Sequence, residues 1–304
     1  MSQPLSIAIL AYPCALQSAV YGLQDVFAHA AQISGTALEV KVLQSYDQTA
    51  DLHDAVILPP SAGMVRAGDI PALPAFLKAQ HRAGTVVCSA CTGLFFVAAA
   101  GLPGGRQVTT HWALDGRFRK DHPEIVLDTD RLLIEYTDLI TAGGLMAWVD
   151  LALALVERFL GYRIASETAR HFIVEFHRRD QRRFRRFRPD LRHGDAAVLK
   201  AQHFLEERLT GQLTVEEMAA ASGLPGRTFL RRFRAATGLA PRAYLQELRI
   251  ERARDLLIET DLPVSSLCFA VGYNDPPSFA RLFTRLSGLA PGAFREQYRR
   301  RETE

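Results

Sequence analysis

The chain has few cysteines, no long apolar run and no net acidic charge. Its 304 residues include 4 Cys, too few for a disulfide framework at this length, which favours a reducing compartment. The longest apolar stretch, residues 145–156, is interrupted by Asp150 and is too short to span a bilayer. The first residues, MSQPLSIAILAYP, have no basic segment ahead of the apolar one, so no secretory signal is predicted. We therefore expect a cytoplasmic protein without a membrane partner.

Charge is distributed unevenly along the chain, whose formal net charge is +3. Residues 1–177 hold 12 Lys and Arg against 17 Asp and Glu, whereas residues 178–304 hold 24 against 16. The length fits two domains of about 150 residues each. Because an acidic surface repels phosphate and a basic one attracts it, only the C-terminal half is predicted to meet a polyanion.

Short apolar runs alternate with helical patterns in the first half. Residues 7–10, 55–58 and 85–87 are continuous apolar segments, typical of parallel strands buried on both faces. Helices are expected over residues 18–34, 71–83, 92–100, 145–160 and 164–177. The alternation predicts a doubly wound, flavodoxin-like α/β domain over residues 1–177.

The second half has only helical patterns, and it repeats itself. The pattern Phe-x-Arg-x-Phe followed by Gly-Leu-Ala-Pro occupies residues 229–241 and again residues 279–291. A repeat of this length is a supersecondary unit used twice. The capping box beginning at Thr214 and the turn glycine Gly223 mark a helix-turn-helix in the first unit, and Asp275 is placed to cap the corresponding helix of the second. We predict an all-α domain over residues 196–304 with two such units, behind a basic linker of residues 178–195.

The spacing within each unit is suited to double-stranded DNA. A recognition helix presents its early residues to base edges while its partner helix crosses the backbone. Arg227, Thr228, Leu230 and Arg231 occupy the outer face of the first such helix, near its start. An all-helical interaction module is the alternative. The arginine-rich segment RRDQRRFRRFR, residues 178–188, fits either a solvated linker or a set of phosphate contacts.

Residues 196–300 resemble the C-terminal double helix-turn-helix domain of AraC/XylS-type transcriptional regulators. The two Gly-Leu-Ala-Pro segments and the SFARLF stretch carry the resemblance. It implies base-reading positions at Arg227, Leu230 and Arg231 and, in the second unit, at residues 276–278, 280 and 281. Because proline donates no hydrogen bond, Pro276 and Pro277 make the second helix a better phosphate clamp than base reader. The DNA-binding residues expected are Arg227, Thr228, Leu230, Arg231, Ser278, Ala280 and Arg281.

A cysteine stands where a strand of the first half turns into a helix. Cys91 lies at this turn, where the helix dipole is expected to lower the pKa of its thiol, and Cys88 lies on the strand as a small buried side chain. His111 follows the next strand and is placed to face Cys91. Three alternatives remain open: a Cys–His nucleophile, a Cys-x-x-Cys redox pair or half a zinc site, and an unreactive thiol in a pocket wall. No paired histidines stand nearby, so we predict no metal.

Residues 5–177 resemble the class I glutamine-amidotransferase-like, ThiJ/PfpI-type fold in the version fused to AraC-type regulators. The segment CTGLFFVAAAGLPGGRQVTTHW, from Cys91 to Trp112, carries the resemblance. Enzymes of this fold often place a glutamate near the end of the first strand, where residues 16–19 have no carboxylate. Residues 59 and 60 are prolines, which supply no N–H to an oxyanion hole. We therefore predict no catalytic residue, with Cys91 and His111 as vestigial candidates. The predicted ligand pocket comprises Gln17, Ser61, Cys91, Thr92 and His111.

Together these features predict a sequence-specific transcriptional regulator that needs no cofactor and is controlled by a small-molecule effector. The resemblance implies a homodimer formed through the N-terminal domain, RNA polymerase as a further partner, a nitrogenous metabolite as effector, and association with the nucleoid. The alternative is a cysteine-dependent hydrolase or glyoxalase-like enzyme that carries a DNA-binding domain.

Overall fold

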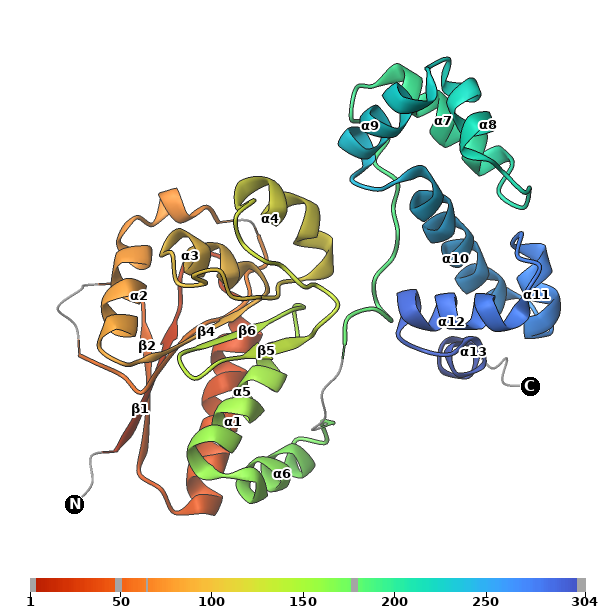
Figure 1. Ribbon diagram of the computed structural model, residues 1–304. Helices are drawn as coiled ribbons and strands as arrows, with labels where there is room; N and C mark the ends of the chain where they lie inside the picture. Colours follow the sequence, from red (N-terminus) through yellow and green to blue (C-terminus); the bar gives the residue numbers. More distant parts are fainter. Residues whose placement is uncertain (1–3, 47–50, 64, 176–179, 300–304) are drawn as a thin grey trace. The chain divides into compact units, whose positions relative to one another are not determined.

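The structure, a computed structural model, describes residues 4–46, 51–63, 65–175 and 180–299. The chain divides into two compact units, Met1–Gln181 and Arg182–Glu304 (Figure 1). The first is an α/β unit and the second consists of helices. This is the fold class that the sequence predicts.

The first unit is built on a six-stranded sheet with the strand order β2-β1-β3-β4-β6-β5. All neighbouring strands run parallel except β5, which pairs antiparallel with β6. Every residue of β3, β4 and β6 is buried, as continuous apolar runs predict for strands covered on both faces. The strands are β1 Leu5–Leu10, β2 Leu38–Leu43, β3 Ala55–Leu58, β4 Val86–Ala90, β5 Leu133–Glu135 and β6 Leu139–Ala142.

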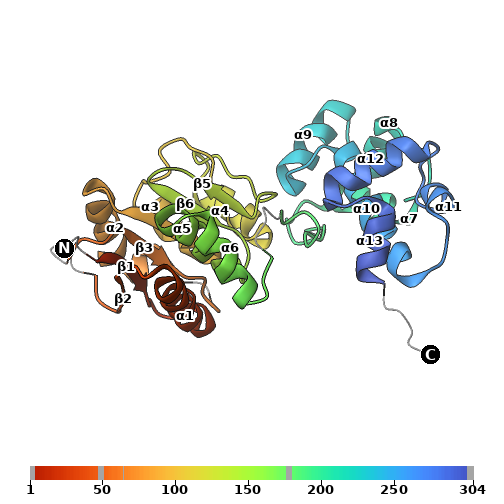
Figure 2. The ribbon, with the colours of Figure 1, turned by 90° about the horizontal axis from the view of Figure 1, so that it is seen from below.

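Helices cover both faces of this sheet (Figures 1 and 2). Helices α1, α5 and α6 pack against one another, and α2 packs against α3. A β-carbon on Gly22 of α1 would lie 2.3 Å from the Trp148 ring, so α1 and α5 approach closely only because residue 22 is glycine. The helices are α1 Gln17–Ser34, α2 Ala72–Arg82, α3 Leu94–Ala99, α4 Asp115–Asp121, α5 Trp148–Leu160 and α6 Tyr162–His171, with 3₁₀ turns η1 Ala67–Asp69, η2 Cys91–Gly93 and η3 Trp112–Leu114.

The last two of these helices differ from the expected bounds. The expected helix 145–160 begins at Trp148, and the expected helix 164–177 spans Tyr162–His171. Gly161 separates the two with a φ of 88°, a conformation that glycine adopts readily. Residues 176 and 177 of the second prediction lie outside the described part of the chain.

The second unit contains two helical clusters joined by one long helix, α10 (Figure 1). Phe229 and Phe233 lie in the core of the first cluster, and Phe279 and Phe283 lie in that of the second. The predicted caps are confirmed: Thr214 forms a capping box with Glu217, and Asp275 accepts the Ser278 N–H at 2.9 Å. The helices are α7 Ala196–Glu207, α8 Val215–Ser222, α9 Gly226–Thr237, α10 Pro241–Glu259, α11 Val264–Ala270, α12 Pro276–Ser287 and α13 Pro291–Tyr298.

The arginine-rich segment ahead of α7 packs on α10. Arg254 of α10 is 2% exposed, and its guanidinium donates to the main-chain oxygens of Arg182, at 3.2 Å, and Arg185. The Arg186 guanidinium lies 2.9 Å from an Asp255 carboxylate oxygen. The compact unit accordingly begins at Arg182, within the expected linker of residues 178–195. The packing of this segment on α10 could not be predicted from its run of charges. An arginine is buried only where oxygen atoms from other parts of the fold accept hydrogen bonds from its guanidinium.

Candidate functional site

Cys91 lies at a sharp turn between β4 and α3. Its φ is 53°, a left-handed conformation that non-glycine residues seldom adopt, and the residue is 5% exposed. Gly93 follows within η2, and a β-carbon there would lie 2.9 Å from the Leu58 main-chain oxygen. The turn is therefore held by close packing of η2 against the end of β3. It lies where the sequence predicts a cysteine between a strand and a helix.

The thiol at this turn is not activated, contrary to the expectation from the helix dipole. Burial raises the pKa of Cys91 to about 11, although the backbone N–H groups of Thr92 and His111 act in the opposite direction. Desolvation disfavours the thiolate, and a 3₁₀ turn leading into a six-residue helix does not offset that penalty. Cys88 is fully buried in β4, and burial raises its pKa as well. At neutral pH both sulfurs are thiols.

The His111 ring serves as a helix cap. Its Nδ1 accepts the Ala113 N–H at 3.0 Å at the start of η3, so this nitrogen is occupied. Burial lowers the pKa of His111, which keeps the imidazole neutral at pH 7. The group of His111 that acts on the Cys91 sulfur is the main-chain N–H. The fold thus brings these two residues together, but through the His111 backbone rather than as a Cys–His pair.

Two other expected pocket residues meet in a buried hydroxyl cluster. Ser61 Oγ lies 2.8 Å from Thr92 Oγ1, and the Ser61 N–H donates to the same oxygen at 2.8 Å. Tyr12, which the sequence reasoning missed, donates to Pro59 O at 2.6 Å and lies 3.4 Å from Thr92 Oγ1. Its position two residues after β1 was the available indication, because the carboxyl ends of parallel strands share one sheet edge.

The loop that would supply oxyanion donors is already hydrogen-bonded. The Ser61 N–H bonds Thr92, and the Ala62 N–H donates to Cys14 O at 2.9 Å. Gln17 is exposed on α1, and its amide makes a long contact of 3.4 Å with Ala15 O. With Pro59 and Pro60 lacking N–H groups, the loop presents few free donors to a substrate oxyanion.

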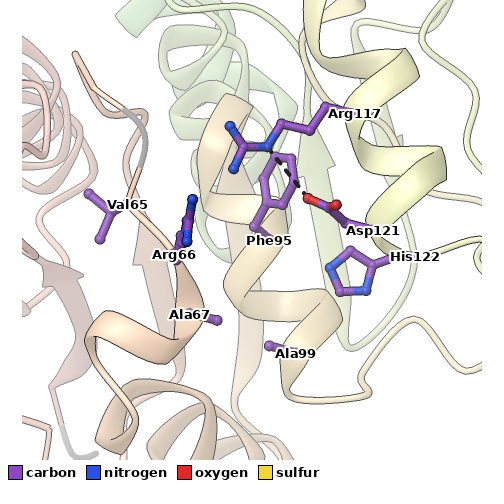
Figure 3. Close-up of a pocket in the computed structure, with 8 residues that line it drawn as sticks. All are labelled: Val65, Arg66, Ala67, Phe95, Ala99, Arg117, Asp121 and His122. Atoms are coloured by element: carbon purple, nitrogen blue, oxygen red, sulfur yellow. Dashed lines mark hydrogen bonds and ion pairs between the residues drawn. The ribbon is translucent and has the colours of Figure 1, made fainter.

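An open cavity of about 370 Å³ lies between η1, α3 and α4 (Figure 3). None of the five expected pocket residues is among those lining it. Its polar side chains come from the residue before η1, from α4 and from the residue after α4, while α3 contributes the Phe95 ring. The lining residues are Val65, Arg66, Ala67, Phe95, Ala99, Arg117, Asp121 and His122.

Helix α9 has one buried and one basic face. Phe229 and Phe233 are fully buried, whereas Arg227, Leu230 and Arg231 are exposed. Thr228 is half-buried beside them. Among the described residues neither Arg227 nor Arg231 has an ion-pair partner. The predicted residues therefore share an accessible surface near the start of the helix, the geometry that a base-reading helix requires.

Helix α12 presents a different surface on the same scaffold. Ser278 and Arg281 are exposed and Ala280 is half-buried. The Arg281 guanidinium donates to Ser278 Oγ at 2.8 Å, so this arginine is oriented along its own helix. Pro276 and Pro277 form the first turn, capped by Asp275.

Two further features bear on function classes. Within the described residues no group of three His, Cys, Asp or Glu side chains is arranged to hold a metal ion. In the same part of the chain, no helix has the length and apolar character needed to cross a membrane.

Comparisons with known proteins agree with this geometry. A family model described as DJ-1/PfpI family matches residues 18–158, and one described as helix-turn-helix domain matches residues 218–297. The HTH-type transcriptional regulator ArgR of Pseudomonas aeruginosa is 28% identical over 75% of this chain and 70% of its own length. Isonitrile hydratase of Pseudomonas putida is 28% identical over 52% of this chain and 73% of its own.

A solved structure from Vibrio parahaemolyticus shares the fold over 56% of this chain and 99% of its own, with a TM-score of 0.51 and 18% identity. At that identity the likeness concerns the fold alone. The chain therefore carries a helix-turn-helix DNA-binding domain of the AraC type behind a domain of the DJ-1/PfpI family, and the relatives that match most of it are named HTH-type transcriptional regulators.

Proposed function

We propose that α9 reads bases in the major groove, with α12 contacting the backbone at a neighbouring site. The observation that carries this proposal is the division of α9 into a buried Phe229/Phe233 face and an exposed face with Arg227 and Arg231. Arginine is the commonest bidentate reader of guanine. The residues proposed to contact DNA are Arg227, Thr228, Leu230, Arg231, Ser278, Ala280 and Arg281.

Selection from a random duplex library with the full chain tests this assignment. Replacing Arg227 or Arg231 with Ala should cost about 1–3 kcal/mol at the selected site and much less on scrambled DNA. Arg234, exposed near the end of the same helix, supplies the matched control variant. Equal losses on both duplexes would assign these arginines to phosphates, and absence of any selected sequence would contradict the proposal.

We further propose that the DJ-1/PfpI domain (residues 1–177) binds a small effector and catalyses no reaction. Three observations support this: the raised pKa of Cys91, the occupied Nδ1 of His111, and the engaged N–H groups of Ser61 and Ala62. The proposed pocket comprises Gln17, Ser61, Cys91, Thr92 and His111, and the proposed ligand is a nitrogenous metabolite. Homodimerisation through this domain, contact with RNA polymerase and a location on the nucleoid in the cytoplasm complete the proposal.

Two Cys91 variants separate a sensor from an enzyme. If the sulfur takes no part in chemistry, Cys91→Ser, which is nearly isosteric, keeps the transcriptional response to an effector found by metabolite screening. Cys91→Trp fills the buried turn and abolishes the response, while both variants still bind DNA. A Cys91→Ser protein that binds effector without responding would show that the sulfur takes part.

The second candidate is a hydratase-like enzyme, favoured by the match to isonitrile hydratase. Incubating the purified chain with cyclohexyl isocyanide and following its conversion to the formamide tests this candidate directly. Turnover that is lost in Cys91→Ser would overturn the non-catalytic proposal. Absence of turnover removes isonitriles as substrates.

A further inference from the structure

The cavity between η1, α3 and α4 is lined on two sides by arginine. Arg66, ahead of η1, and Arg117, on α4, line it from different segments, and the Arg117 guanidinium lies over the Phe95 ring (Figure 3). Its volume of about 370 Å³ falls in the range of small-molecule sites. Arg66 and Arg117 are 51 positions apart in the sequence, so only the fold brings them to one cavity.

Positive charge exceeds negative charge among these lining residues. The carboxylate of Asp121 lies 3.4 Å from the Arg117 guanidinium, in an i,i+4 pair whose side chains are 41% and 43% exposed. Such an exposed pair contributes little stability, so an incoming anion can share Arg117 at low cost. Among the described residues no carboxylate forms an ion pair with Arg66, although Asp69 accepts its main-chain N–H at 2.9 Å. The second arginine is thus available to an anion.

Apart from the His122 ring, the rest of the wall is apolar. Phe95 and Val65 are 6% and 9% exposed, and the small side chains of Ala67 and Ala99 complete the floor. The Arg117 guanidinium lies 5.9 Å from the centre of the Phe95 ring, a cation–π distance that holds it over the aromatic face. A ligand that carries charge but no apolar group, such as inorganic phosphate, would make no apolar contact with this wall.

We propose that this cavity binds a small organic carboxylate with an apolar body. The carboxylate would lie between Arg66 and Arg117, where guanidinium groups offer paired donors, and the body would pack against Phe95 and Ala99. This site shares no residue with the pocket around Cys91, and the proposal does not depend on effector control. Because Arg66 precedes η1 and Arg117 lies on α4, occupation would tie these two surface segments together.

Calorimetric titration of the full chain with benzoate tests the proposal, with benzamide as the neutral analogue and sulfate as an anion without an apolar body. Benzoate should bind saturably, and benzamide about tenfold or more weaker. Arg66→Gln and Arg117→Gln should each weaken benzoate binding by about tenfold. Arg163→Gln is the matched control, because Arg163 forms an exposed i,i+4 pair with Glu167 on α6, far from the cavity lining. Unliganded melting temperatures check that each variant is folded.

Three outcomes would overturn the inference. In the first, benzoate saturates no site up to about 10 mM. In the second, it binds the Gln variants as tightly as the unchanged chain. In the third, benzamide binds as tightly as benzoate. Sulfate that binds as well as benzoate and depends on both arginines would reduce the site to a simple anion site. A negative result in the benzoate titration does not change the result of the DNA selection. The proposal that the chain is a DNA-binding regulator is therefore tested independently.

Discussion

The two helix-turn-helix units share their packing and differ in what they expose. In each, a buried Phe pair anchors the recognition helix, and a left-handed glycine, Gly238 or Gly288, ends it. Helix α9 begins at Gly226 without a side-chain cap, whereas α12 begins with two prolines behind the Asp275 cap. The repeat therefore preserves the scaffold while the outer face changes, because packing constrains the inner positions and not the outer ones.

The two units also differ in how they are held to the rest of the helical domain. Arg254 donates to Leu286 O and Ser287 Oγ at the end of α12, both at 3.1 Å, and to the segment that begins at Arg182. The first unit is held by Asp195, whose carboxylate caps α7 and lies 2.7 Å from Arg232 of α9. One unit thus depends on a buried arginine and the other on a partly exposed ion pair.

Removing the buried arginine should give the largest effect. Arg254→Met would leave carbonyl oxygens without donors and remove one of the two arginines paired with the Glu251 carboxylate, at 2.8 Å, at a cost of about 3–5 kcal/mol. Circular dichroism during urea unfolding reports the helices of both domains, so the transition of the helical domain is the part that tryptophan fluorescence does not follow. Fluorescence of Trp112 and Trp148, both in the other domain, is the internal reference. Arg252→Met, exposed on the same helix, is the control, and an equal effect of both would contradict the assignment.

The turn glycines offer the next comparison. Gly223 and Gly272 both have positive φ, of 71° and 84°. Nothing lies within 4 Å of a β-carbon built on Gly223, whereas one on Gly272 would lie 2.8 Å from Thr210 O. Gly223→Ala should therefore cost about 1 kcal/mol in backbone strain, and Gly272→Ala about 1–3 kcal/mol more from the clash. Equal losses in urea unfolding would show that the chain relaxes around residue 272.

DNA binding should distinguish the two recognition helices. We expect Arg231→Ala to lower affinity for a selected duplex by about 1–3 kcal/mol with little effect on random DNA. Arg281→Ala should weaken both duplexes alike and reduce the salt slope by about 1, because Ser278 orients it as a phosphate contact. Fluorescence anisotropy at several salt concentrations measures both quantities. The proposed division of roles fails if Arg281 proves as sequence-dependent as Arg231.

The Asp195–Arg232 ion pair of the first unit should give the smallest effect, a dependence of stability on acid pH. The hydrogen bond from Arg232 holds the pKa of Asp195 at about 2, below the unfolded value of about 3.9. A lowered folded pKa adds stability above pH about 4, and this contribution is lost as pH falls toward 2. Asp195→Asn should flatten the pH dependence of unfolding in that window. The second unit has Leu282 where the first has Arg232, so it lacks this pair.

Much of the architecture was predictable from local patterns. Apolar runs predicted the buried strands, and short polar motifs predicted the caps at Thr214 and Asp275. The spaced repeat of Phe, Arg and Gly-Leu-Ala-Pro predicted the two helix-turn-helix units. Such features depend on residues a few positions apart, whose periodicity determines which face is buried. The position of the strand-to-helix turn at Cys91 was predicted correctly for the same reason.

The state of the functional groups was not predictable in this way. The expected low pKa of Cys91 was wrong because burial, which depends on the surrounding fold, outweighs the local dipole. The arginine-rich segment was expected to be a linker, yet its carbonyl groups receive donors from Arg254, about seventy residues away. Neither outcome can be predicted from residues that are adjacent along the chain.

By itself the sequence determined the two domains, their secondary structure and the basic face of α9, because each follows from composition and short-range periodicity. Only the tertiary structure decided which ionisable groups are desolvated, which arginines are buried and which remain free. It alone brought Arg66 and Arg117 to one cavity. Desolvation and pairing are properties of a three-dimensional neighbourhood, in which residues distant along the chain set the free energy of a charge.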